Sequence, residues 1–333
     1  MSSEYLDRDV YLNVRCLYAA AGYRLQGRGG ADPDLLVVLR GDQGTADRDY
    51  AGPIHLYDYV KEYRVDWAAR YPASRAITWI SLDQPGAIAD TRLRHLCGYL
   101  PVFAELWRCR TRRRRQRPVH VANYKRIPGD PFQEQLLGLI RSGLVEVHGG
   151  RWQTVGVSAR PLSYLQANRL IAGRASCFGL MWPYQRGRTL SGRMWQAPLN
   201  GCFVFAEPGS DPLGCPGVLM LERFDEQAAT RIFAPEEGEA LARQAAAFWR
   251  SHTEALAAGL GLDPAAARPG PWRIHRLRLE LLRWDLGFRL QRWQGRVAAP
   301  LAGAAAAVRQ ALARLARALG VHPAQRRGGD PHQ

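Results

Sequence analysis

Short apolar runs alternate with stretches of helical spacing along the first third of the chain. The runs carry no helical stripe, which is typical of strands buried on both faces of a parallel sheet. Between them, apolar residues recur at the three- and four-residue steps that form one face of a helix. This alternation predicts a parallel α/β domain. The predicted strands are 34–40, 53–57 and 76–81, and the predicted helices are 2–22, 58–71 and 88–107.

The same alternation resumes after an arginine-rich segment, RCRTRRRRQRP, at 108–118. A dense block of like charge cannot be buried, so we interpret it as a solvated linker, with contact to an anionic surface as the alternative. The linker separates a small N-terminal α/β domain, 1–107, from a second α/β domain, 119–258. The strands predicted in the second domain are 119–123, 144–148, 175–181, 202–206 and 218–221, and its helices include 193–200 and 235–257.

The remaining segment, 259–333, is basic and predicts two amphipathic helices followed by a disordered end. Packing of the apolar stripe on the same protein, or on a second copy, is the commoner fate of such helices. Tryptophan beside arginine also suits an anionic membrane surface, so both hypotheses stay open. The stripe of the first helix is Ile274, Leu277, Leu281, Trp284 and Phe288, and the second helix repeats it at 308–319.

Composition places the chain among globular proteins, with 47% hydrophobic residues. No apolar run is long enough to span a bilayer, and the N-terminus lacks the pattern of a signal peptide. The six cysteines form no C-x-x-C pair, and no His or Cys pair has metal-ligand spacing. We therefore expect a cytoplasmic protein, peripheral on the inner face of the cell membrane if its tail binds lipid.

The formal net charge of +16 raises the hypothesis of nucleic-acid binding. Only Lys61 and Lys125 are lysines, and an arginine-dominated excess of this kind is typical of a GC-rich genome. No motif of a nucleic-acid-binding fold accompanies the arginines. Nucleic acid is therefore the less favoured partner.

The segment 174–207, RASCFGLMWPYQRGRTLSGRMWQAPLNGCFVFAE, is the strongest candidate for a ligand site. It predicts a strand, a polar loop, a short helix that Ser191 caps and a second buried strand in immediate succession. Ligands of parallel sheets collect at the carboxyl ends of strands, where helix N-termini attract anions. Arg186, Arg188 and Arg193 lie there, and a guanidinium binds phosphate in a planar fork without losing its proton. The sequence therefore predicts a phosphate site.

The motif LSGRMWQAPLNGCFVFAEPG, together with VHVAN at 119–123 and LVEVHGGRW at 144–152, resembles the C-terminal half of GT-B glycosyltransferases. It is most similar to the CgeB-like group of the family-1-like transferases, and the resemblance spans 118–249. It implies two Rossmann-like domains in a GT-B-like arrangement. The nucleotide-sugar would bind to the second domain, and the acceptor and any catalytic base would belong to the first. The resemblance implies neither a cofactor, beyond the nucleotide-sugar as donor substrate, nor a metal ion.

Several residues acquire roles from this resemblance. It implies that Glu207 bonds hydroxyls of the donor, whereas Gln196 stands where the family often has a glutamate. Asn123, Gly149 and Gly150 follow two predicted strands and would lie against the nucleotide. Two glycines after a strand are also sufficient to make an ordinary turn.

The candidate catalytic residues are His55 and Asp83, which lie at or just beyond predicted strand ends, as does Asp58. A general base must sit near the acceptor hydroxyl, and the first domain is where the resemblance implies that hydroxyl binds. An aspartate directly after a strand is more often a turn former or a helix cap, so a structural role for Asp83 is the commoner outcome.

The favoured function is metal-independent transfer of a sugar from a nucleotide-sugar to a glycan, a lipid-linked acceptor or a protein. Arg188 and Arg193 would compensate the negative charge that develops on the leaving diphosphate. Gln196 and the short N-terminal domain favour an alternative, a catalytically inactive GT-B-like binding module. A basic nucleic-acid-binding protein is the third hypothesis.

Overall fold

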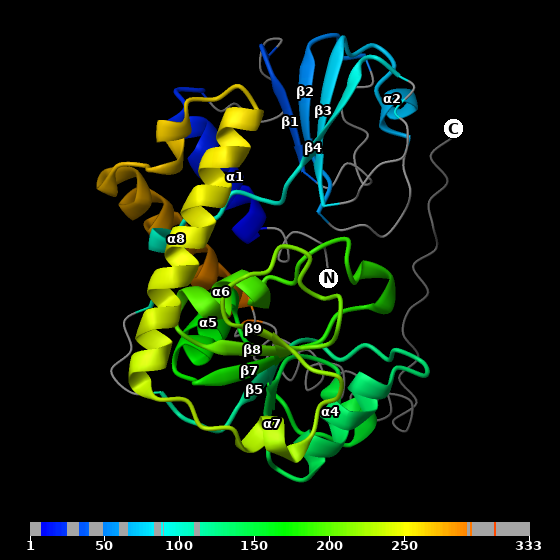
Figure 1. Cartoon of the computed structure of the whole chain (residues 1–333), viewed down its shortest axis with the longest axis vertical. Coiled ribbons are helices and arrows are strands. Elements are labelled where there is room, and N and C mark those ends of the chain that lie inside the picture. Colours follow the sequence, from blue (N-terminus) through cyan, green and yellow to red (C-terminus); the bar gives the residue numbers. More distant parts are fainter. Residues whose placement is uncertain are drawn as a thin grey trace, which may run out of the picture. The chain divides into compact units, whose positions relative to one another are not determined.

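The structure is a computed structural model that contains two parallel β-sheets with α-helices alternating along the chain (Figure 1). The predicted α/β class is therefore confirmed. The chain forms two compact units, 1–281, which holds both sheets, and 282–333. The domain boundaries inferred from the sequence stay predictions. The described residues are 8–24, 33–39, 49–59, 66–82, 88, 90–109, 114–291, 294 and 310.

The first sheet has the strand order β1-β2-β3-β4, and each pair of neighbours is parallel. Apolar side chains on strands β2 and β3 pack against Trp67 and Tyr71, which are 3% and 1% exposed. The predicted strands 53–57 and 76–81 are confirmed residue for residue. The elements of this part are α1 (Arg8–Ala20), β1 (Leu36–Leu39), β2 (Pro53–Tyr57), α2 (Trp67–Arg70), β3 (Ala76–Ser81), β4 (Leu93–Cys97) and α3 (Ala104–Trp107).

The predicted helix 88–107 is wrong. Its first part is strand β4, which pairs with β3 from Leu93 opposite Ile77 to Cys97 opposite Ser81. Gly98 and Pro101 then interrupt any helix, because glycine is flexible and proline lacks the N–H and clashes with the preceding turn. The apolar spacing of this segment suits a helix, but pairing along the edge of the sheet overrides it. Helix α2 is likewise shorter than the predicted helix 58–71, of which 60–65 lie outside the described residues.

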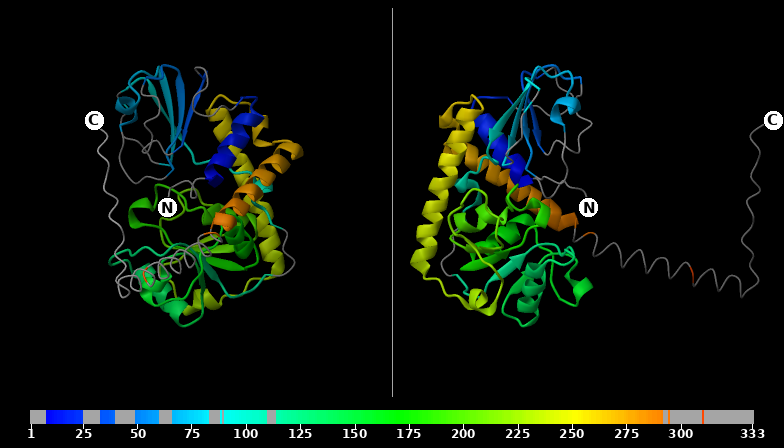
Figure 2. Two further views of the ribbon diagram at one scale, coloured as in Figure 1. Left: turned by 180° about the vertical axis from the view of Figure 1, so that it is seen from behind. Right: turned by 45° about the vertical axis from the view of Figure 1, so that its right-hand side comes forward.

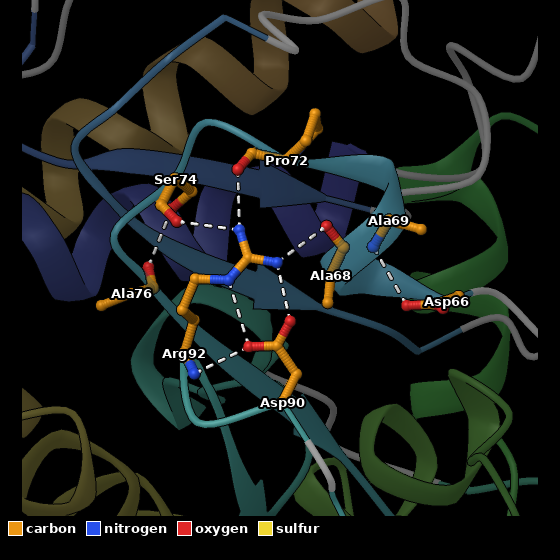
Figure 3. Close-up of polar contacts among 8 residues, drawn as sticks. All are labelled: Asp66, Ala68, Ala69, Pro72, Ser74, Ala76, Asp90 and Arg92. Atoms are coloured by element: carbon orange, nitrogen blue, oxygen red, sulfur yellow. Dashed lines mark hydrogen bonds and ion pairs between the residues drawn. The ribbon is translucent and has the colours of Figure 1, made fainter.

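Arg92, just before β4, ties this strand to the turn after α2 (Figure 3). Its guanidinium pairs with Asp90 at 2.7 Å and donates to the carbonyl oxygens of Pro72 at 2.7 Å and Ser74 at 3.3 Å. The hydroxyl of Ser74 in turn donates to the carbonyl of Gly52 at 2.8 Å. These backbone carbonyl oxygens, which have no partner in the hydrogen-bond ladder of the sheet, thereby receive hydrogen bonds.

The second sheet has the order β6-β5-β7-β8-β9 and is also fully parallel. Helices α4 and α7 cover one face, where Phe178, Phe205 and Phe224 form the centre of the core. Helices α5 and α6 cover the other face. The strands are β5 (Val119–Val121), β6 (Glu146–His148), β7 (Ser176–Gly179), β8 (Phe203–Ala206) and β9 (Val218–Met220). The helices are α4 (Pro131–Arg141), α5 (Tyr164–Ala172), α6 (Arg193–Leu199), α7 (Glu226–Thr230) and α8 (Pro235–Gly259).

Local chemistry fixes where these helices begin and end. Asp130 caps α4 by accepting a bond from the Gln133 N–H at 3.0 Å, and Pro131 follows it at a position that needs no donor. Ser163 and Gln166 form a capping box at the start of α5. Gly201, with φ of 70°, follows α6 in the left-handed conformation that ends helices.

The long helix α8 packs against α6 and also reaches the segment after β4 (Figure 1). Thr253, which is fully buried, accepts a bond from the Val102 N–H at 3.1 Å, and the side chain of His252 accepts one from the Tyr99 N–H at 3.4 Å. Burial lowers the pKa of His252 to about 4.

A further helix covers 271–291, and its first part lies beside α1 and α8 (Figure 2). Ile274, Leu277 and Leu281 are buried, and Glu280 pairs with Arg15 of α1 at 2.5 Å. This half of the predicted apolar stripe therefore packs on its own protein. The second predicted helix, 308–319, lies outside the described residues except for residue 310. None of the helices that the structure describes has the length and apolar character needed to cross a bilayer.

Replacing His252 by glutamine tests the buried histidine. In the unfolded chain His252 takes up a proton below a pH of about 6.5. In the folded protein it stays neutral until the pH falls to about 4. The wild-type protein therefore loses stability as the pH falls through this window. Glutamine keeps an acceptor for Tyr99 but does not titrate. We expect the slope of the unfolding free energy against pH to fall by about 1.4 kcal/mol per pH unit near pH 5, measured by urea unfolding; equal slopes would contradict this.

Candidate functional site

The second sheet has one topological switch point, between strands β5 and β7. The chain leaves β5 to form β6 on one side, and it then returns through α5 to form β7 on the other side. Connections therefore diverge above the carboxyl ends of these two strands, which leaves a crevice where ligands of open α/β sheets bind.

A cavity of about 320 Å³ lies at this point. Its walls include the residues after β5, the residues after β7, the start of α6 and one side of α4, and also Val10, Tyr59, Tyr99 and Leu100. Trp152, Tyr124 and Trp182 supply aromatic surface, and the rings of Tyr124 and Trp152 lie 5.2 Å apart. Lys125 lies 5.4 Å above the ring of Trp182 and adds a positive charge to the lining. Such a volume, with mixed aromatic and cationic walls, is typical of a small-molecule site.

Arg193, the first residue of α6, closes the crevice between the two strands. Its guanidinium donates to the carbonyl oxygen of Val121 and, at 3.2 Å, to that of Leu180. Its Nε is buried and has no partner among the residues that the structure describes. Burial lowers the pKa of Arg193, although an arginine remains protonated at physiological pH. Among the described residues, the guanidinium of Arg193 therefore forms hydrogen bonds only with backbone carbonyl oxygens, and its side chain lines the cavity.

His120, on β5, lies in the same wall. Its Nδ1 is 2.9 Å from the carbonyl oxygen of Phe178 on β7, and its ring meets Trp152 edge to face at 5.6 Å. Burial and then the charge of Arg193 lower the pKa of His120 to about 3, so the ring is neutral at physiological pH.

Arg186 has a different environment from Arg193. Its Nε lies 3.1 Å from Oε1 of Glu207, and its Nη2 lies 2.5 Å from Oδ2 of Asp130. The fully buried Glu207 also accepts the Met181 N–H at 2.6 Å. Burial raises the pKa of Glu207, and Met181 and Arg186 oppose this effect. The ion pairs join the end of β8, the start of α4 and the loop after β7, so they position the loop that forms one wall of the cavity.

The structure brings two of the predicted donor-binding residues, Arg193 and Asn123, into the lining of the cavity. Glu207 and Arg186 lie in the buried ion pair instead, and Gln196 is buried in α6, where it donates to the hydroxyl of Tyr164. Arg188 is partly exposed in the loop 186–192. Their roles toward a donor stay predictions.

The two glycines shape the strand end. Gly149 has φ of 143°, and a Cβ atom there would lie 1.8 Å from the carbonyl oxygen of Ala122. The N–H of Gly150 donates to Oδ1 of Asn123 at 2.7 Å. The absence of a side chain at Gly149 therefore lets its backbone approach Ala122, directly after strand β5. The bond from Gly150 then keeps Asn123 in place beside the cavity.

Of the two candidate bases, the structure describes His55. Nδ1 of His55 is 2.8 Å from the hydroxyl of Tyr18, which is 3.3 Å from the hydroxyl of Tyr57. Burial lowers the pKa of His55 to about 4. His55 does not line the cavity, and Asp83 lies outside the described residues. Within the described chain, no cluster of His, Cys, Asp or Glu side chains could hold a metal ion.

Sequence reasoning missed His120 and the aromatic walls. His120 sits inside the predicted strand VHVAN, and a histidine in an otherwise apolar strand was a usable signal. Trp152 follows the glycine pair and donates from Nε1 to the carbonyl of Ala122 at 2.7 Å. No periodicity reveals that contact, because it joins two loops that only the sheet brings together.

Neither a family model nor a curated protein matches the chain. Among solved structures, the backbone is similar to an alpha-glucosyltransferase in complex with UDP-glucose and DNA containing an abasic site, with a TM-score of 0.39 and 9% identity over 73% of this chain and 80% of that chain. It is also similar to the GtfA/B complex, with a TM-score of 0.34 and 9% identity over 79% of this chain and 60% of that chain. The chemistry of the site rests on its own residues.

Replacing Arg186 by methionine tests the buried ion pair. Glu207 would remain buried without its cation, so we expect the free energy of unfolding to fall by about 3 kcal/mol in urea titrations. Arg223 forms an exposed pair with Asp225 and is 72% exposed, so Arg223→Met serves as the matched control, with a change within about 0.5 kcal/mol. Equal effects of the two substitutions would show that the burial of Glu207 is immaterial.

Gly149→Ala tests the close approach at the end of β5. The added methyl group meets the Ala122 carbonyl in a backbone conformation that disfavours side chains, so we expect a loss of about 2 kcal/mol or more. Gly138 in α4 has open space around it, and Gly138→Ala should instead stabilise the protein by about 0.5 kcal/mol. Thermal and urea unfolding of both variants measures the contrast; a neutral Gly149→Ala would refute it.

Proposed function

We propose that the protein transfers a sugar from a nucleotide-sugar, bound in the cavity between β5 and β7, to a glycan, a lipid-linked acceptor or a protein. The observation that carries this proposal is the buried guanidinium of Arg193, held by the carbonyls of Val121 and Leu180 at the switch point of the sheet. Glu207 acts on this cation only through its charge, so a phosphate group would supply an anion in direct hydrogen-bond contact.

The chemistry of sugar transfer suits this placement. Negative charge builds on the leaving diphosphate as the glycosidic bond breaks, and a fixed cation in a site of low polarity stabilises that charge strongly. Arg193 is already positioned by its two carbonyl acceptors, so little reorganisation is needed during the reaction. Lys125 provides a second, exposed cation near the same cavity.

The aromatic residues of the lining favour a nucleotide over a simple anion. Bases stack on aromatic side chains with energies of about 1–3 kcal/mol each. Trp152, Tyr124 and Trp182 offer such surfaces beside the cation. The resemblance of residues 118–249 to GT-B glycosyltransferases points to the same class of ligand, and it is the basis for proposing a sugar as the transferred group.

A catalytically inactive nucleotide-binding module is the second candidate. It is favoured by one observation: none of the described residues that line the cavity is a carboxylate. Transfer without an enzymic base close to the donor leaves activation of the acceptor unexplained. Release of free nucleotide from a bound nucleotide-sugar, measured with and without glycan acceptors, distinguishes the two, because a binding module binds the donor without consuming it.

The donor site is tested by Arg193→Gln. In a thermal-shift panel with UDP, GDP, ADP and CMP and their sugar conjugates, we expect one nucleotide family to raise the unfolding midpoint of the wild-type protein. Loss of charge-assisted bonds to phosphate should weaken this ligand about thirtyfold in Arg193→Gln. Arg223→Gln removes an exposed arginine and should bind normally.

Unchanged affinity in Arg193→Gln would overturn the assignment. Because Arg193 also bonds two strand ends, its variant is compared with the wild type by circular dichroism without ligand. Arg193→Lys, which retains the charge but not the planar fork, should show intermediate affinity.

A further inference from the structure

His120 presents a hydrogen-bond acceptor next to the cation of the cavity. A carbonyl oxygen only accepts, so the short contact of Nδ1 with the carbonyl of Phe178 places the ring proton on Nδ1. The other nitrogen, Nε2, then carries a lone pair. Within the described part of the chain Nε2 has no hydrogen-bond partner, although the side chain belongs to a residue that is only 3% exposed and lines the cavity.

Two amide oxygens in the lining already accept hydrogen bonds. Oδ1 of Asn123 accepts the Gly150 N–H at 2.7 Å, and Oε1 of Gln133 accepts the Ile127 N–H at 2.7 Å. Nε2 of His120 is not among the fully buried polar atoms that lack a partner, so it is open to the cavity that His120 lines, and a ligand there can donate to it directly. Nε2 of His120 is therefore an acceptor that a ligand has reason to reach.

The position of His120 identifies the group that donates. His120 directly precedes Val121, whose carbonyl holds Arg193, so the acceptor and the cation are neighbours along β5. In a nucleotide or nucleotide-sugar, the unit attached directly to phosphate is a sugar. A donor that lies a few atoms from the phosphate is therefore a sugar hydroxyl.

We propose that Nε2 of His120 accepts a hydrogen bond from a sugar hydroxyl of the ligand whose phosphate pairs with Arg193. This inference rests on the proposed function, and it makes His120 a residue that determines ligand specificity. The hydroxyl belongs either to the ribose or to the transferred hexose, since both sugars flank the diphosphate.

The test is His120→Asn. The amide nitrogen of asparagine can replace Nδ1 as donor to Phe178, whereas nothing replaces Nε2. The control is His252→Gln, which changes a buried histidine that does not line the cavity. Unfolding midpoints without ligand establish that both variants are folded.

Calorimetric titration uses UDP, ADP and GDP, each beside its 2′-deoxy and 3′-deoxy analogue. For the ribose as source, the wild-type protein and His252→Gln should bind one ribonucleotide about tenfold more tightly than a deoxy analogue. This ratio should fall to about one in His120→Asn. If the hydroxyl belongs to the hexose, the tenfold preference, and its loss in His120→Asn, should appear instead between UDP-glucose and its deoxyglucose analogues.

Two results overturn the inference while leaving the donor site intact. One is nucleotide binding by the wild-type protein without preference for any of these hydroxyls. The other is a preference that His120→Asn retains. Absence of binding by every nucleotide to the wild-type protein is a different result, since it refutes the proposed function itself.

Discussion

The site at the second sheet depends on the hydrogen bonds that the guanidinium of Arg193 makes. It bonds the carbonyl oxygens that follow two neighbouring strands, β5 and β7, at the point where their connections diverge. A sheet that splits in this way leaves strand-end carbonyls without ladder partners, and buried carbonyls need donors. Arginine meets this need with several N–H groups in one plane, but it brings a charge into the interior. The residue that donates hydrogen bonds to the carbonyl oxygens at the switch point is therefore also a cation in the wall of the cavity.

The loop that precedes Arg193 is itself fixed by a second arginine. Arg186 joins Glu207 and Asp130, and Glu207 receives the N–H of Met181 directly after β7. Arg186 thereby pairs with two carboxylates beneath the loop, and neither carboxylate belongs to the cavity lining. If Glu207 paired with Arg193 instead, the charge available to a ligand would be cancelled. The two arginines thus have separate roles: Arg186 in the loop positions the wall of the cavity, and Arg193 at the start of α6 gives the wall its charge.

Much of this architecture was predictable from periodicity. Strands β2, β3, β5, β7 and β8 and helices α6 and α8 lie where the apolar pattern places them, because burial of the strands on both faces leaves a clear pattern. Strand β4 was not predicted, since Leu93 and Leu96 also fit a helix and only pairing with β3 decides between the two. The segment that contains Arg193 was predicted as a phosphate site, which stays a prediction, whereas the different environments of Arg186 and Arg193 were not predicted. Those environments depend on Asp130, which is far away in sequence, and on which strand ends become neighbours.

The pairing of Glu207 with Arg186 also explains why a neutral histidine is useful in this wall. With Glu207 paired elsewhere, the described lining contains the cations Arg193 and Lys125 and the Nε2 lone pair of His120. The charge of Arg193 helps to keep His120 unprotonated, so the cation maintains the acceptor beside it. A carboxylate in that position would accept a hydroxyl equally well, but it would repel phosphate. A neutral acceptor next to a fixed cation instead favours a ligand that carries both an anionic group and a nearby hydroxyl, which is the combination that a sugar phosphate presents.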